Sequence, residues 1–356
     1  MSKTVKTGET VTISGQYKPK NSKTEVTFVK GNRVPPTKFG ATTFTLVDTT
    51  KHKGGKIMYI SDYFNLEKGH CNFEFVDINI TTDTELFIDP CLIEVNSSRF
   101  CKAANETVQD YFNSFYDLYR NHKSSSEKLN LFQYAHEINA TKLGYGSGNN
   151  GKAKTANGMI KTFQPLQKLI DSNIPLSKAI DLPIFIRDFA EDCLSDMLTN
   201  ILFLELSNYT IEQCNKYSIP LSTIPKKYHY WDNNIHGWKP YEGKGLLIDG
   251  IPLLLVPKHI VRHCFYYNTD QYFRSIILER IQAEQTFYNT DGKEIKPSKR
   301  SLKESLLKSH SDILEISEKE TIKCPQLLDN HHEKIKVSYT SRGLTDEELD
   351  YWIYQH

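Results

Sequence analysis

Helical spacing of apolar residues dominates the chain after residue 58. Residues 104–119 carry aromatic and apolar side chains three or four positions apart, which predicts a helix with one buried face. The same spacing predicts a long amphipathic helix over residues 183–217 and another helix over residues 260–285. Shorter helices are predicted at residues 129–140 and 156–170.

Strand patterns are shorter. In the first 57 residues, segments 25–29 and 42–47 alternate β-branched or aromatic residues with polar ones, which predicts a small three-stranded ribbon. Residues 72–80 and 84–88 predict strands, and residues 245–256 predict a buried hairpin. We therefore expect an α/β or α+β protein, with a mixed sheet flanked by long helices and a small β-rich N-terminal module.

The charge is divided unevenly along the chain. Residues 1–57 hold 11 Lys/Arg and 3 Asp/Glu, a net charge of +8, whereas the remaining residues have a net charge of −7. A module of this size buries little apolar surface on its own. It should therefore dock on the rest of the chain or move independently. The sequence predicts a basic β-ribbon module at 1–57, a mixed α/β main domain at 58–288, and a polar, helical extension at 289–356.

Overall composition excludes several classes of protein. The 356 residues include 44 Lys/Arg and 43 Asp/Glu, which is unlike a strongly basic nucleic-acid coat protein. No apolar run reaches the roughly 18–20 residues of a membrane helix, so we expect no association with a membrane. The seven cysteines are odd in number and lack C-x-x-C spacing, which favours a cytoplasmic protein over a disulfide framework or a zinc ribbon.

A glycine-rich loop is the first candidate site. The stretch GYGSGNNGKA satisfies G-x-x-x-x-G-K from Gly146 to Lys152. The backbone at Gly146, Gly148 and Gly151 and the ammonium of Lys152 are suited to binding a phosphate. Ala153 stands where a nucleotide triphosphatase has the Ser or Thr that binds magnesium. The loop therefore predicts an anion site, or an ordinary surface loop, and no triphosphatase site.

A polar stripe follows the predicted long helix. Asp188, Asp192, Asp196 and Asn200 recur every four residues, so they should lie along one face. The helix is apolar almost all round near Asp196 and Asn200, which predicts that these two are partly buried and need a partner. Their oxygens are ligands that Mg²⁺ or Mn²⁺ prefers, although a solvated face is the alternative. Glu137, just before the glycine-rich loop, is a candidate general base or ligand.

Two apolar strands end in charged residues. Asp89 follows the first strand and Lys258 follows the second, and these are the minimal parts of a metal-dependent nuclease. The aspartate would bind the cation and the lysine would stabilise charge on the phosphorus. The restriction-endonuclease pattern is not met, because Val256 occupies the acidic position two residues before the lysine. The alternative is that Asp89 ends a strand in a turn and Lys258 opens the next helix.

Histidines supply a weaker set of candidates. His259 and His263 are four residues apart within a predicted helix, a spacing that can bind zinc. His229 and His236 lie near tryptophans in a predicted loop. Each is more often a packed or surface side chain than a ligand.

Four segments together resemble a family of uncharacterised bacterial proteins. They are residues 84–90 (TELFIDP), 143–152 (LGYGSGNNGK), 195–213 (SDMLTNILFLELSNYTIEQ) and 253–262 (LLLVPKHIVR). The resemblance covers roughly residues 59–305. Those proteins are associated with mobile or phage-defence gene neighbourhoods, and the resemblance implies no established reaction. Separately, residues 14–37 are similar to short free-standing bacterial proteins of unknown function, which implies a fusion of two modules.

Two functional hypotheses follow. The first is a metal-dependent nuclease or phosphodiesterase-like effector in phage defence, with nucleic acid as its partner and the glycine-rich loop on phosphate. Its catalytic residues would be Asp89, Asp196, Lys258 and Glu137. Its ligands for Mg²⁺ or Mn²⁺ would be Asp89, Asp196 and Asn200. The second is a non-catalytic sensor or adaptor that binds a protein or nucleotide partner, since no catalytic motif is complete.

Overall fold

The computed structural model describes residues 4–13, 15–20, 26–28, 33–34, 42–48, 58–136, 140–145, 155–339 and 343–355. Contacts divide the chain into two compact units, Met1–Met58 and Tyr59–His356. Long helices and several small sheets confirm an α+β class, and every strand pair in the described residues is antiparallel. No described helix is both long and apolar enough to span a bilayer.

The first unit is a four-stranded sheet in the order β1-β4-β2-β3. Its strands are β1 (Thr4–Lys6), β2 (Gly15–Pro19), β3 (Val26–Phe28) and β4 (Thr43–Asp48). The sequence predicts three strands here and locates two of them, which correspond to β3 and β4; β1 and β2 have no located counterpart in the prediction. Strand β1 pairs with β4 because Val5 lies opposite Phe44, and both side chains enter a small core with Tyr17.

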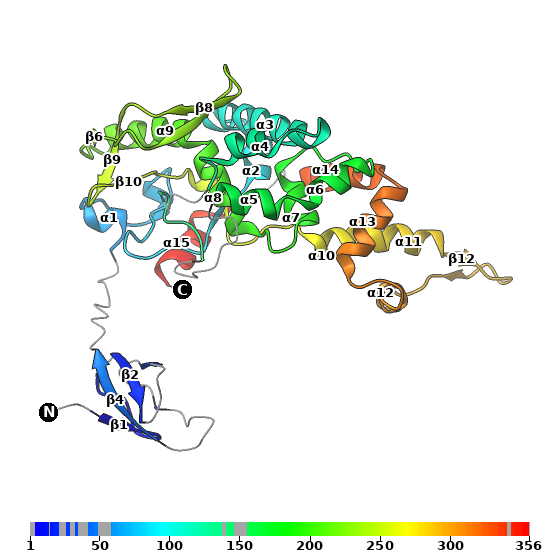
Figure 1. Cartoon of the computed structure of the whole chain (residues 1–356), viewed down its shortest axis with the longest axis horizontal. Coiled ribbons are helices and arrows are strands. Elements are labelled where there is room, and N and C mark those ends of the chain that lie inside the picture. Colours follow the sequence, from blue (N-terminus) through cyan, green and yellow to red (C-terminus); the bar gives the residue numbers. More distant parts are fainter. Residues whose placement is uncertain are drawn as a thin grey trace. The chain divides into compact units, whose positions relative to one another are not determined.

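The second unit is mainly helical (Figure 1). Its helices are α1 (Ile60–Tyr63), α2 (Pro90–Val95), α3 (Arg99–Arg120), α4 (Ser125–Phe132), α5 (Ala156–Thr162), α6 (Pro165–Asp171), α7 (Leu182–Phe185), α8 (Glu191–Ile201), α9 (Phe203–Lys216), α10 (Thr269–Tyr272), α11 (Leu278–Glu284), α12 (Lys299–Leu306), α13 (Ile313–Lys323), α14 (Gln326–Tyr339) and α15 (Asp346–Tyr354). Short 3-10 turns are η1 (His70–Asn72), η2 (Ala179–Asp181) and η3 (Lys258–Ile260), and a π-helical turn, η4 (Phe273–Ile277), joins α10 to α11.

Short strands complete this unit. They are β5 (Phe87–Ile88), β6 (Ser222–Thr223), β7 (His229–Asp232), β8 (Gly237–Pro240), β9 (Lys244–Ile248), β10 (Ile251–Leu253), β11 (Val261–Arg262), β12 (Phe287–Tyr288) and β13 (Glu294–Ile295). The hairpin predicted near residues 245–256 is confirmed as β9–β10. Its two-residue turn places Asp249 (φ 51°) and Gly250 (φ 78°) at positive φ, the conformation that a tight hairpin turn requires.

Helix α3 confirms the prediction for residues 104–119 and supplies much of the core. Ser98 caps its first turn by accepting a hydrogen bond from the amide of Cys101 (3.1 Å). Its buried aromatic face includes Tyr111, Phe115 and Tyr119. The helix contacts α4, α6, α8 and α9, so this face joins helices from distant parts of the chain.

The long helix predicted over residues 183–217 is interrupted. The chain leaves the helical conformation at Ile186 (φ −111°, ψ 119°), passes through Asp188 at a positive φ of 58°, and resumes with α8 and then α9. The predicted polar stripe is therefore wrong for Asp188, which does not belong to the helix that carries Asp192, Asp196 and Asn200.

The helix predicted over residues 260–285 begins only at Thr269. Its expected first residues form β11 instead, which pairs with β5. The prediction that His259 and His263 lie one turn apart on a helix is therefore wrong. The ring of His259 lies 3.4 Å from the sulfur of Cys101, whereas His263 stacks on Trp352 at 4.8 Å.

Residues 72–80 form no regular strand among the described residues. Phe75 makes only an isolated bridge to Pro257. The amide of Val76 donates to the carbonyl of Val256 (2.9 Å), and Ile78 donates back to the carbonyl of Val76. This local turn ends the extended pairing that the alternating sequence predicts.

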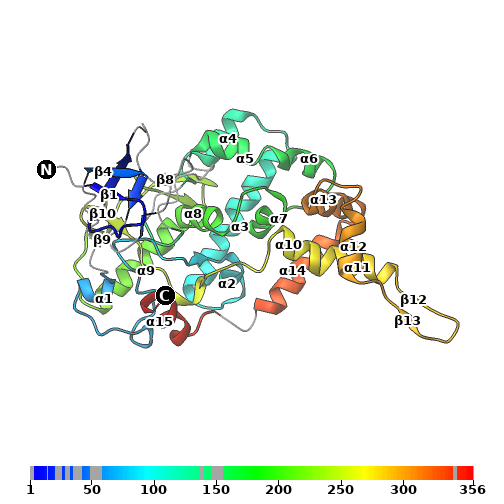
Figure 2. The same cartoon turned by 90° about the horizontal axis from the view of Figure 1, so that it is seen from below.

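Helices α11 to α14 gather at one end of the second unit (Figures 1 and 2). The hairpin β12–β13 projects beyond them in both views. Phe287 is 59% exposed and Tyr288 is 70% exposed, so the aromatic side chains of this hairpin lie largely in solvent.

Candidate functional site

Asp89 lies at the end of β5 and is fully buried. Its Oδ1 accepts hydrogen bonds from the amide of Cys91 and the hydroxyl of Tyr267, both at 2.8 Å, and so caps helix α2. The guanidinium Nε of Arg262 lies 3.5 Å from Oδ2. The hydroxyl of Tyr267 and the guanidinium of Arg262 thus offset the cost of burying this carboxylate.

Lys258 begins η3, and its ammonium pairs with other elements of the fold. It donates to the carbonyl of His70 (2.8 Å) and to the carboxylate of Asp346 (2.6 Å). His70 is fully buried, and its Nε2 accepts from the backbone amide of Asp77 (3.1 Å). Its Nδ1 therefore carries the proton and donates to Asp350 (2.5 Å). These bonds join Lys258 to η1 and α15, and no described contact joins its ammonium to Asp89.

Asp196 and Asn200 lie one turn apart on α8. Asn200 is only 2% exposed, so its predicted burial is confirmed. Its amide Nδ2 donates to the carbonyls of His136 (2.7 Å) and Asp196 (3.1 Å). Its Oδ1 accepts no hydrogen bond from the described residues. The metal-binding role of this pair stays a prediction.

Five predicted site residues lie outside the described residues. They are Glu137, Gly146, Gly148, Gly151 and Lys152. Just before the glycine-rich stretch, the amide of Tyr145 lies 3.4 Å from the carboxylate of Asp192 on α8, and the ring of Tyr145 packs on Phe87.

A pocket of about 250 Å³ opens beside Asn200, and we call it the Asn200 pocket. It is lined by Tyr134, His136, Asn200, Lys227, Tyr228 and His229. The rings of Tyr134 and His229 stack with centroids 3.6 Å apart and planes 9° from parallel. Among the described residues its lining combines two imidazoles, one ammonium, two phenols and the amide of Asn200, whereas Glu137, which follows His136, lies outside the described part of the chain. Such a lining suits an anionic ligand with a planar ring.

The protonation of His229 follows from its neighbour. Its Nδ1 lies 3.3 Å from the carbonyl oxygen of Lys227, which can only accept a hydrogen bond. The neutral ring therefore carries its proton on Nδ1 and leaves a lone pair on Nε2. The ring of His136 makes no hydrogen bond with the described residues. Two imidazoles, the side chains that most often transfer protons in enzymes, thus line this pocket.

Sequence reasoning placed His229 in a loop and did not single out Lys227 or the ring of His136. The structure places His229 at the start of β7, where the local sequence KKYHYW alternates basic and aromatic residues. That alternation is the signal that could have indicated the pocket. The contribution of Asn200, from a helix distant in sequence, could not be deduced from it.

A three-ligand metal site is absent from the part of the chain that the structure describes, since no group of three His, Cys, Asp or Glu side chains there is arranged to hold an ion. The Mg²⁺ or Mn²⁺ expectation is not tested by this finding, because Glu137 lies outside that part.

The second unit is an α+β domain with a pocket lined by polar and aromatic side chains. Residues 65–268 match the model of a family described as a domain of unknown function, DUF8370, and the chain belongs to this family. All six residues of the Asn200 pocket lie within the matched range. No curated protein and no solved structure matches the chain.

Proposed function

We propose that the DUF8370 domain binds a phosphodiester group of nucleic acid in the Asn200 pocket and cleaves it. The observation that supports this most strongly is the meeting of two imidazoles and an ammonium in one pocket, where one of the imidazoles, that of His229, stacks on the ring of Tyr134. An anionic phosphate is compatible with that charge. A nucleobase has a flat face suited to the ring of Tyr134.

The chemistry would be proton transfer around phosphorus. Nε2 of His229 takes the proton from the attacking water as its oxygen bonds to phosphorus. His136, in its protonated form, gives a proton to the oxygen that leaves. Lys227 stabilises the negative charge that develops between these events. The products are a phosphate monoester and a free hydroxyl.

A metal-dependent form of this proposal uses the residues that the sequence singles out. Mg²⁺ or Mn²⁺ would bind Asn200 Oδ1 with Asp196 and Glu137 and neutralise the phosphate. Catalytic roles for Asp89 and Lys258 remain part of this form. Phosphate binding by the glycine-rich loop, including Lys152, would add affinity.

The second candidate is a sensor that binds the same ligand without cleaving it. It is favoured by the engagement of Asp89 and Lys258, two predicted catalytic residues, in hydrogen bonds that hold the fold. The resemblance to proteins of phage-defence neighbourhoods makes foreign nucleic acid the first ligand to test and the cytoplasm the expected location. The N-terminal unit, by its resemblance to free-standing proteins, would be a fused recruiting or regulatory module.

The test uses the full chain with labelled single- and double-stranded DNA and RNA, in Mg²⁺, in Mn²⁺ and in EDTA. Cleavage should fall by about 100-fold or more in His229→Ala, as for loss of a general base. Lys227→Ala should weaken both binding and cleavage. Lys226→Ala, whose side chain is 81% exposed, and His122→Ala, 67% exposed, are matched controls that should cleave normally.

The metal conditions separate the two forms of the enzyme. Cleavage in EDTA would support histidine chemistry alone, and cleavage only with a divalent ion would support the metal-dependent form. Binding that His229→Ala weakens, without any cleavage, would replace the enzyme by the sensor. If no nucleic acid is bound or cleaved, the Asn200 pocket is not a phosphodiester site.

A further inference from the structure

The first unit carries an excess of positive charge. Residues 1–57 hold 11 Lys/Arg and 3 Asp/Glu, a net charge of +8, whereas the rest of the chain has a net charge of −7. Charge of one sign in so small a unit repels itself and attracts anions. The register of the four-stranded sheet shows where part of this charge lies.

The outer face of this sheet follows from its strand pairing. Val5 lies opposite Phe44 and both are buried, so the residues that alternate with them point away from the core. Lys20 follows the end of β2 and continues the pairing, because its amide donates to the carbonyl of Thr43 (2.9 Å). Two rows of side chains therefore cross β1, β4 and β2, and we call them the lysine face. The rows are Thr4, Thr45 and Lys18, and Lys6, Thr43 and Lys20.

The three lysines of this face are exposed. None of their ammoniums forms a hydrogen bond or an ion pair with a described residue. The carboxylate of Glu9 accepts from the backbone amide of Lys6 (2.8 Å) and does not pair with the ammonium of that residue. Neither row contains a carboxylate. An anion can thus approach all three ammoniums without breaking a contact within the described part of the unit.

Sheet geometry spreads these charges over an open surface. Neighbouring strands lie about 4.8 Å apart, so the backbones of Lys6 and Lys20, on either side of β4, are roughly 10 Å apart. Lys18 and Lys20 are two residues apart, or about 6.7 Å along an extended chain. The side chains of Thr43 and Thr45 lie between the lysines and add hydroxyl donors. This spacing suits a chain of phosphates better than one small anion.

The other side chains of the first unit favour nucleic acid over a membrane. Val47, at 52% exposure, is the one large hydrophobic side chain that the described residues of this unit expose. Binding to a lipid surface usually requires bulky apolar side chains, and base stacking requires aromatic rings. Lysine and threonine instead contact phosphate and sugar, which carry no sequence information.

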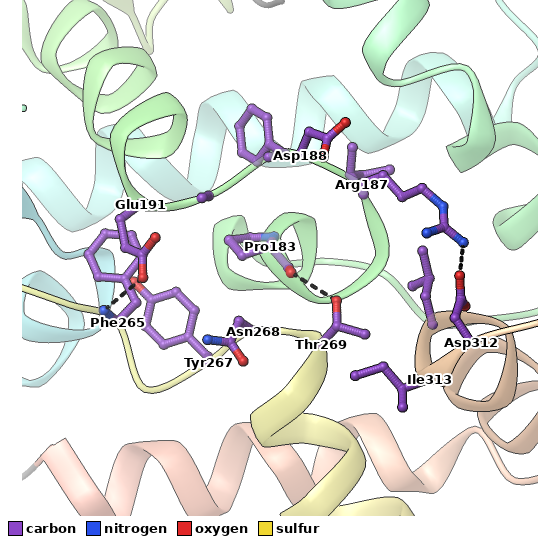
Figure 3. A pocket seen from close by; sticks show the side chains of 14 residues that line it. Pro183, Arg187, Asp188, Glu191, Phe265, Tyr267, Asn268, Thr269, Asp312 and Ile313 are labelled. Carbon is purple, nitrogen blue, oxygen red and sulfur yellow. Dashed lines mark hydrogen bonds and ion pairs between the residues drawn. The ribbon is translucent and has the colours of Figure 1, made fainter. Parts of the chain in front are cut away.

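A cavity of about 350 Å³ in the second unit has the opposite charge. The residues that line it include one guanidinium, Arg187, and three carboxylates, Asp188, Glu191 and Asp312 (Figure 3). Arg187 donates a hydrogen bond to Asp312 and so is already paired. This lining disfavours a polyanion, so extended contact with nucleic acid is better supplied by the lysine face.

We propose that the lysine face binds the phosphodiester backbone of nucleic acid, independently of base sequence. The ammoniums of Lys6, Lys18 and Lys20 pair with phosphates, and the threonine hydroxyls donate to phosphate oxygens. The inference rests on the proposed function for its choice of partner, but it concerns a separate surface. By holding the same strand, the first unit would raise the concentration of nucleic acid at the Asn200 pocket.

Binding can be measured on the full chain by fluorescence anisotropy. The probes are short labelled DNA and RNA of mixed sequence, single- and double-stranded, in EDTA at several salt concentrations. Replacing Lys6, Lys18 and Lys20 together by glutamine should weaken binding by about tenfold or more at about 0.1 M salt. The slope of log K against log salt should fall in magnitude by about 2–3, since three phosphate contacts are lost.

Two further variants separate local charge from fold and from net charge. Replacing the same three lysines by arginine keeps the charge at the same exposed positions, so this variant should bind as the parent does. The matched control replaces three lysines of the second unit by glutamine and should keep the salt slope of the parent. These lysines are exposed and have no ion pair with the described residues: Lys293, Lys296 and Lys308.

Four results would overturn the proposal. They are unchanged affinity and slope in the glutamine variant of the lysine face, an equal loss in its arginine variant, an equal loss in the control variant, and binding to phosphatidylserine vesicles but to no nucleic acid. A denaturing gel of the same samples distinguishes this failure from failure of the proposed function. If His229→Ala changes neither binding nor cleavage, the Asn200 pocket is contradicted and the lysine face is not. If His229→Ala abolishes cleavage while the lysine variants bind normally, only the lysine face is contradicted.

Discussion

Glu205 on helix α9 makes a quantitative prediction, because its carboxyl group is incompletely hydrogen-bonded inside the protein. Its Oε1 accepts from the hydroxyl of Thr107 (2.5 Å), and Thr107 accepts in turn from the amide Nδ2 of Asn233 (3.2 Å). Glu205 Oε2 and Asn233 Oδ1 are both buried without a hydrogen bond in the described structure. A proton on Glu205 would remove the charge and supply a donor among these acceptors.

Burial raises the pKa of Glu205 from 4.5 to about 7, against the smaller effect of the bond from Thr107. Below pH 4.5 Glu205 is protonated in both the folded and the unfolded chain, so folding buries no charge at this position. As the pH rises toward 7, the unfolded chain loses the proton more readily, and the free energy of unfolding falls. At roughly 1.4 kcal/mol for each pH unit, the loss above pH 7 is about 3 kcal/mol.

Replacing Glu205 by glutamine should remove that loss. The Glu205→Gln variant should exceed the parent by up to about 3 kcal/mol at pH 8, and the difference should shrink toward zero as the pH approaches 4.5. Guanidinium unfolding can follow this, since all three tryptophans, Trp231, Trp238 and Trp352, report on the second unit. Glu212→Gln, exposed on the same helix, is the control. A stability difference that is the same at pH 5 and pH 8 would refute a buried, titrating Glu205.

Two further predictions use the same unfolding assay. Tyr354→Phe removes the hydroxyl that donates to the buried Asp77 (2.6 Å), and it should cost about 1.5–3 kcal/mol; a cost near zero would mean that α15 does not hold this carboxylate. Phe115→Ala removes a fully buried ring of α3 that packs against Phe132 and Phe163, and it should cost about 3–5 kcal/mol; a loss below about 1 kcal/mol would contradict its central place in the core.

The sequence predicted elements whose signal is local. Helix α3 was found because its aromatic residues repeat at the helical period from Tyr111 to Tyr119, over about two and a half turns. The β9–β10 hairpin was found because apolar strands flank Asp249 and Gly250. The break between α7 and α8 was missed, because no Gly or Pro lies between Phe185 and Glu191 to mark it. Strand β11 was missed because it consists of two residues that pair with β5, about 170 positions earlier.

The candidate site shows the same division. Burial of Asn200 could be predicted from the apolar residues around it on one helix. The partner that its amide finds, the carbonyl of His136, is 64 positions away, and no periodicity relates the two. Lys258 could be selected from the sequence because lysine is a residue type that catalytic sites use. Its hydrogen bond to Asp346 could not be predicted, because it depends on how helix α15 packs on the rest of the unit. Residue type indicates chemistry, and long-range packing decides which groups meet.

The projecting β12–β13 hairpin has a practical consequence. Its turn is closed by Asn289, whose side chain accepts from the amides of Asp291 (3.1 Å) and Lys293 (2.8 Å), while Gly292 has a φ of 73°. The turn lies at the end of the hairpin remote from the helices (Figures 1 and 2). A cysteine introduced at Asp291, with the exposed native Cys71 replaced, would carry a fluorophore at the far end of this hairpin. The hairpin therefore offers a site for surface immobilisation or single-molecule measurements.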